Sequence, residues 1–82
     1  MYKVPSSERL REFLKAHNLT GATAAGLVGV EPRTVRRWTA YESAANRQPV
    51  PYSAWTLLRL YVGEISVDQY RVEVLLEAGN GS

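Results

Sequence analysis

The apolar residues recur at helical spacing and divide the chain into short segments, which glycine, proline and polar residues separate. Residues 6–18 predict a first helix, capped by Ser6 or Ser7, because its apolar residues lie three and four positions apart. Residues 51–62 are apolar almost all round, which indicates a helix that is buried on more than one side. Gly63 directly follows them and predicts the end of that helix.

The last segment, residues 66–78, fits two kinds of structure. Ser66, followed three residues later by Gln69, forms a capping box and favours a helix. The same segment alternates apolar and polar residues and is rich in valine, which favours a strand. We prefer the helix, and the strand remains the alternative. Either structure would carry more apolar surface than one small domain needs, so we expect a dimerisation surface. Its residues would be Tyr70, Val72, Val74, Leu75 and Leu76.

Residues 20–41 predict two short helices joined by a tight turn. Thr20 can cap the first of them by accepting a hydrogen bond from a free backbone N–H. Gly29 suits the turn, because glycine adopts the left-handed backbone conformation without a steric cost. Pro32 has no backbone N–H and therefore suits the first position of the second helix, which we expect over residues 32–41.

The second of these helices is predicted to have two different sides. One side carries Val35, Trp38 and Tyr41, and the other carries Arg33, Arg36 and Arg37. The apolar side is expected to face the core. Three neighbouring guanidinium groups repel one another, so the other side makes sense if an anionic partner binds it. Because arginine reads guanine through two hydrogen bonds and also pairs with phosphate, the three arginines are candidates for DNA base contacts.

This unit resembles the helix-turn-helix of the lambda-repressor-like group, the small phage Cro and repressor proteins. The resemblance covers residues 20–41 closely and the surrounding helices loosely. The residues that carry it are Ala24, Ala25, Gly29, Val30, Val35 and Trp38. Two residues depart from the pattern of the group. Glu31 stands where serine or aspartate usually caps, and Gly21 stands where a polar residue often begins the first helix.

The helical pattern and the resemblance together predict an all-α protein, a compact bundle of about five short helices containing a helix-turn-helix. The resemblance implies a dimeric transcriptional repressor that binds a palindromic operator in double-stranded DNA. Candidates for phosphate contacts are Thr20, Thr34, Arg47 and Gln48. The layout, with Pro51 and Tyr52 leading the next apolar helix, is also similar to that of anti-CRISPR-associated repressors of phages and mobile elements. Those repressors regulate their own operon.

Composition adds a domain count and a charge pattern. Eighty-two residues predict a single domain, residues 1–82, whose last four residues, 79–82, are expected to fray. The formal net charge is only +2. Residues 1–59 carry nine Lys and Arg against four Glu, whereas residues 60–82 carry one Arg against four acidic residues. A basic body with an acidic tail is typical of a protein whose body faces DNA.

Other classes of function find little support in the sequence. The chain has no cysteine and a single histidine, His17, which has no partner at metal-ligand spacing, so we expect no metal and no cofactor. No paired carboxylates or phosphate-binding glycine loop indicate an enzyme. We expect no membrane segment, no small-molecule effector and a location in the cytoplasm of a bacterial host. A protein-interaction module, an antitoxin or an inhibitor that retains the helix-turn-helix shape, remains the alternative.

Overall fold

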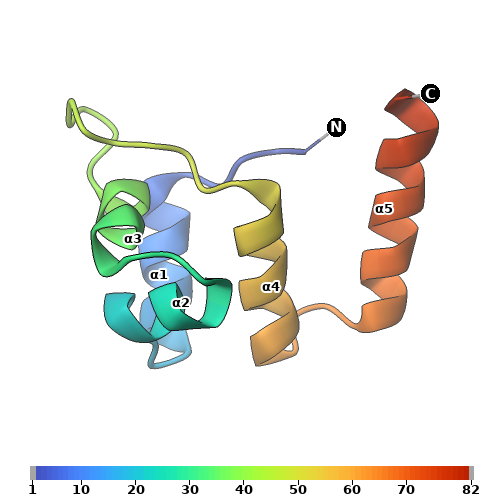
Figure 1. The fold of residues 1–82 in the computed structure, drawn as a ribbon, viewed down its shortest axis with the longest axis horizontal. Coiled ribbons are helices and arrows are strands. Elements are labelled where there is room, and N and C mark those ends of the chain that lie inside the picture. The colour runs from blue at the N-terminus through green and yellow to red at the C-terminus, as the bar shows by residue number, and fades with distance from the viewer. Residues whose placement is uncertain (1, 82) are drawn as a thin grey trace.

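The computed structural model describes residues 2–81, with side chains through residue 76, and this part of the chain forms five helices (Figure 1). They are α1 (Ser7–Ala16), α2 (Gly21–Val28), α3 (Pro32–Thr39), α4 (Tyr52–Val62) and α5 (Val67–Gly81). No strand occurs within residues 2–81. The predicted all-α fold is therefore confirmed. The helix over residues 66–78 is confirmed as well, and the strand alternative is wrong.

Local capping explains where α1 and α5 begin. The Ser6 hydroxyl accepts a hydrogen bond from the Arg9 N–H at 3.0 Å, which is the N-cap of α1. At the start of α5, the Ser66 hydroxyl accepts from the Gln69 N–H at 3.1 Å, and the Gln69 amide oxygen accepts from the Ser66 N–H at 2.8 Å. This reciprocal pair is the predicted capping box. The helix continues to Gly81, and Ser82 of the expected frayed tail lies outside the described residues.

The core lies between the first four helices. α2 packs against α3 and α4, and α1 packs against α3. The Phe13 ring of α1 meets the Trp55 ring of α4 edge-on, with 4.9 Å between the ring centroids. The buried apolar residues are Leu10, Phe13, Leu14, Ala24, Ala25, Val35, Trp38, Val50, Ala54, Trp55 and Leu58. The small residues Ala24 and Ala25 of α2 allow its close contact with α3 and α4.

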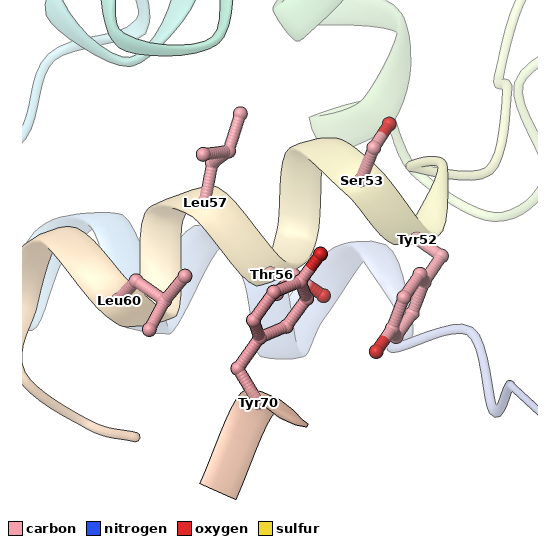
Figure 2. Close-up of a pocket in the computed structure, with 6 residues that line it drawn as sticks. All are labelled: Tyr52, Ser53, Thr56, Leu57, Leu60 and Tyr70. Atoms are coloured by element: carbon pink, nitrogen blue, oxygen red, sulfur yellow. The ribbon is translucent and has the colours of Figure 1, made fainter. Parts of the chain in front are cut away.

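α5 stands beside α4 at the end of the molecule opposite α3 (Figure 1). A polar cluster joins the two helices: the Glu73 carboxylate pairs with the Arg59 guanidinium at 3.2 Å and accepts a hydrogen bond from the Tyr52 hydroxyl at 3.2 Å. The Arg59 hydrogen bond lowers the pKa of Glu73 against the opposing effect of burial. An open pocket of about 320 Å³ lies next to this cluster, and the Tyr70 ring extends into it from α5 toward Thr56 (Figure 2).

One sequence prediction fails at the end of α3. We expected the helix over residues 32–41 with Tyr41 facing the core, but α3 ends at Thr39 and Tyr41 is 74% exposed. Ala40 has an extended backbone, with ψ at 155°, so the chain leaves the helical path and the three-residue spacing no longer applies. The Tyr41 ring lies instead beneath the Arg11 guanidinium, 4.8 Å from its central carbon.

Within residues 2–81, none of the helices combines the length and the apolar character that crossing a membrane requires.

Candidate nucleic-acid interface

α2 and α3 form the predicted helix-turn-helix unit, which comprises residues 20–39. The Thr20 hydroxyl accepts from the Thr23 N–H at 3.1 Å and caps α2. Gly29 ends the helix in the left-handed conformation, with φ at 75°. The Gly29 N–H donates to the Ala25 carbonyl, and the Val30 N–H donates to the same carbonyl at 3.0 Å. The turn is therefore fixed by hydrogen bonds between neighbours in sequence.

The start of α3 uses proline and leaves its N-cap side chain free for another contact. Pro32 occupies the first turn, where its missing N–H costs nothing. Glu31 holds the N-cap position, but its side chain makes no capping hydrogen bond. Its carboxylate pairs instead with the Arg33 guanidinium at 2.9 Å, and both side chains remain mostly exposed. The departure at Glu31 noted in the sequence thus places an acid on one edge of the arginine face.

The arginine face of α3, defined as Arg33, Arg36 and Arg37, lies opposite its buried side. Val35 and Trp38 are 2% and 4% exposed, which anchors the helix in the core. Arg36 is exposed and Arg37 is half-buried. Among the side chains that the structure describes, neither of these two has an ion-pair partner. Two guanidinium groups on a firmly anchored helix are thus available to an anionic ligand.

The carbonyl groups in the last turns of α3 accept hydrogen bonds from a side chain of the helix itself and from two groups elsewhere in the fold. The Thr39 hydroxyl donates to the Val35 carbonyl at 3.0 Å. The Gln48 backbone N–H, from the following loop, donates to the Arg37 carbonyl at 3.0 Å. The Arg11 guanidinium of α1 donates to the Thr39 carbonyl at 2.7 Å. The C-terminal end of the helix that carries the arginine face is therefore held by α1 and by the loop that follows α3.

The four residues expected to contact phosphate occupy different settings. Thr20 is exposed at the N-terminus of α2, and Thr34 is half-buried in the first turn of α3. The Gln48 side chain is exposed beside the end of α3. Arg47 is already engaged: its side chain is only 18% exposed and its guanidinium lies 3.3 Å from the Glu42 carboxylate. Thr34 thus lies on α3 and Gln48 lies beside its end, whereas Arg47 is paired with Glu42 within the loop.

Sequence reasoning missed the role of Glu42. Its carboxylate accepts hydrogen bonds from the Ser7 N–H at 2.9 Å and from the Ser7 hydroxyl at 3.2 Å, at the start of α1. The Ser7 N–H is the main cause of the lowered pKa of Glu42; burial opposes it, and the charges of Arg47 and Arg11 add to it. The contact joins residues 35 positions apart, so no local pattern could have found it.

The expected dimerisation surface on α5 is largely open. Val72, Val74, Leu75 and Leu76 are all exposed, with Leu75 at 70% and Leu76 at 65%. Tyr70 differs from the other four, because its side chain turns toward α4 and lines the pocket (Figure 2). A helix that leaves large apolar side chains in water is typical of a surface that another protein covers.

The sequence of this chain is similar to that of known transcriptional repressors. No family model matches the chain. The chain is 44% identical over 62 residues to a transcriptional repressor protein KorC from Escherichia coli, covering 72% of this chain and 67% of that protein. It is 40% identical over 57 residues to a second transcriptional repressor protein KorC from Escherichia coli, covering 66% of this chain and 61% of that protein.

Proposed function

This chain belongs to the family of the transcriptional repressor protein KorC, and from that premise we propose that it is a sequence-specific, double-stranded DNA-binding repressor. The observation that carries the proposal is the arginine face of α3, which is directed away from the core while Val35 and Trp38 anchor the helix. In this proposal α3 enters the major groove, and Arg36 and Arg37 contact base edges. Arg33 would also contact a base if its ion pair with Glu31 breaks, and otherwise it would lie at the edge of the DNA interface.

Phosphate contacts would orient the protein without reading the sequence. Thr20 and Thr34 stand at the N-terminal ends of α2 and α3, where backbone N–H groups and the helix dipole favour an anion. Gln48 would approach the same strand from the loop. Arg47 would reach phosphate only by leaving Glu42, so we assign it the smallest share of these contacts.

We propose further that the repressor acts as a homodimer joined through α5. A single short recognition helix buries too little surface for specific binding at cellular salt, and a second copy doubles the contact. The exposed apolar residues of α5 supply a surface for that pairing. Two copies related by a twofold axis would bind a palindrome whose half-sites lie one helical turn, ~34 Å, apart.

The proposal also includes the group of repressors to which the protein is related and the way in which it represses. We place the helix-turn-helix unit in the lambda-repressor-like group and, within it, nearest to the anti-CRISPR-associated repressors of phages and mobile elements. Repression would be steric, through occupation of a promoter in the cytoplasm of the host. The protein would bind and not catalyse, and its own concentration would set the degree of repression without a small-molecule effector.

A gel-shift titration at several salt concentrations tests this function. The probe is the DNA directly upstream of the coding sequence, and a scrambled duplex of the same composition is the control. Binding that prefers the upstream DNA and weakens as salt rises supports an autoregulating repressor. Equal affinity for both duplexes contradicts sequence-specific recognition of this site. No binding at low salt contradicts DNA binding and favours a protein partner.

Single arginine variants then test the assignment of the reading face. Arg36→Ala and Arg37→Ala remove side chains that take no part in the core, so the helix content stays that of the wild type. Loss of a base-reading arginine lowers specific binding by roughly 1–3 kcal/mol. Wild-type binding by all three arginine variants, Arg33→Ala included, contradicts the assignment.

A further inference from the structure

The end of α3 differs from the ends of the other helices in the body. α2 and α4 end at glycines with positive φ, Gly29 at 75° and Gly63 at 80°, and the residue that follows the C-cap of α1, Asn18, has φ at 55°. This left-handed turn lets the backbone satisfy its own last carbonyl groups. α3 ends at Ala40 with an extended backbone and lacks this device. Its last carbonyl therefore depends on a donor from another helix.

Arg11 of α1 is that donor. Its guanidinium donates to the Thr39 carbonyl at 2.7 Å, a short, charge-assisted hydrogen bond between elements 28 residues apart. A positive charge at this place also interacts favourably with the C-terminal end of the helix dipole. Arg11 thus supplies the hydrogen bond that the last carbonyl of α3 lacks, and its charge adds to that of Arg36 and Arg37 in the last turn.

The surroundings of Arg11 hold its guanidinium in this position. The Tyr41 ring lies against one face of it, with 4.8 Å between the ring centroid and the central carbon of the guanidinium. The Glu42 carboxylate is close enough for the charge of Arg11 to contribute to the lowered pKa of Glu42. Arg11 itself is half-buried. Tyr41 and Glu42, which follow two and three residues after the end of α3, therefore keep the guanidinium on the last carbonyl of that helix.

We propose that Arg11 is a positioning residue for DNA reading, which fixes the end of α3 so that Arg36 and Arg37 meet the bases in one register. The inference rests on the proposed function, because it assumes that α3 reads DNA. Arg36 and Arg37 lie in the last turn of α3, three and two residues before the Thr39 carbonyl that Arg11 holds. Release of that carbonyl leaves the Gln48 N–H on the Arg37 carbonyl as the contact from outside α3 that holds the last turn. The backbone that carries both arginines is then less firmly placed, so the last turn frays more easily.

The test compares specific with non-specific binding. The specific probe is the duplex that the wild-type protein enriches most from a randomised pool, and the non-specific probe is its scrambled form. In Arg11→Met we expect the ratio of the two affinities to fall about tenfold, the scale of losing one base contact. The dependence of non-specific binding on salt should stay that of the wild type, because the number of phosphate contacts does not change.

Arg9→Met is the matched control. It removes one arginine from the same helix, but Arg9 pairs with Glu64 at 3.1 Å and lies over the Trp55 ring, in contact with no group of α3 among the described hydrogen bonds and ion pairs. We expect its affinity ratio to equal that of the wild type. Arg11→Lys is the second variant. It keeps the positive charge beside Glu42, so it is the milder change and serves as the test if Arg11→Met fails to fold. Because an ammonium lacks the planar fork, we expect its ratio to fall by less than in Arg11→Met.

Other results overturn the inference in distinguishable ways. If both affinities fall together and the slope of log affinity against log salt becomes shallower by about one, Arg11 is itself a phosphate contact. If the ratio is that of the wild type in every folded Arg11 variant, the residue has no positioning role. If the wild-type protein enriches no duplex, the proposed function fails and the inference falls with it.

Discussion

Replacing either of two glycines of the helix-turn-helix unit by alanine should change the stability of the fold, in opposite directions. Gly29→Ala places a side chain at φ 75°, and nothing lies within 4 Å of the new Cβ, so the cost is backbone strain alone. That strain is roughly 1–2 kcal/mol for a residue with a Cβ. The smaller entropy of the unfolded chain offsets roughly 0.4–1 kcal/mol of it, which leaves a net destabilisation on the order of 1 kcal/mol.

Gly26→Ala is the matched variant in the same helix. Its φ is not positive, and the new Cβ again meets nothing within 4 Å. Alanine in a helix is favoured over glycine by roughly 0.5–1 kcal/mol, so this variant should be more stable than the wild type. The two substitutions add the same methyl group, three residues apart, and differ only in backbone conformation.

Thermal unfolding followed by circular dichroism measures both effects. All samples are kept at one protein concentration, because the proposed dimer would have a concentration-dependent Tm. One kcal/mol corresponds to about 4–8 °C for a domain of this size. We expect Gly29→Ala to melt several degrees below the wild type and Gly26→Ala to melt above it. Equal shifts of the same sign, or a Gly29→Ala protein as stable as the wild type, would refute the left-handed turn.

Three further predictions concern the core, the polar cluster and α5. Trp38→Ala should destabilise the domain by roughly 3–5 kcal/mol in urea unfolding, because the ring is almost fully buried; a loss below roughly 1 kcal/mol contradicts that burial. The lowered pKa of Glu73 means that its ionised form stabilises the fold above the ordinary carboxyl pKa of about 4.3 and that this contribution is lost as the pH falls through the lowered value. Melting from pH 7 to pH 3 should therefore show a smaller drop in Tm for Glu73→Gln than for the wild type, and identical pH profiles count against the contact. If the protein pairs through α5 as proposed, Leu76→Glu should be a monomer in light scattering, whereas Val4→Glu, which alters another exposed apolar side chain, should remain a dimer; dimers in both variants exclude Leu76 from the interface.

Features that depend on neighbours in sequence were predictable. The cap at Thr20, the turn at Gly29 and the capping box at Ser66 and Gln69 each follow from one to four adjacent residues, and the structure contains all three. The buried side of α3 was predictable for the same reason, because Val35 and Trp38 lie inside one short helix.

Features that depend on distant contacts were not. The prediction that Tyr41 faces the core failed because the three-residue spacing was continued beyond the last helical residue, and no glycine marks that end. The last carbonyl of the helix accepts its hydrogen bond from Arg11, which comes from another helix. Arg47 resembles a free loop arginine in the sequence, and only the fold shows its ion pair with Glu42. Arg59, the one charge in an otherwise apolar helix, was the available signal for the contact with Glu73.

Selection from a randomised duplex pool by the wild-type protein tests the central claim most directly, since it requires no knowledge of the operator. If the arginine face of α3 reads the major groove in a dimer, the enriched duplexes contain an inverted repeat with guanines in each half-site and centres about one helical turn apart. Enrichment of no sequence, at low or at physiological salt, would contradict the claim that this protein recognises specific DNA.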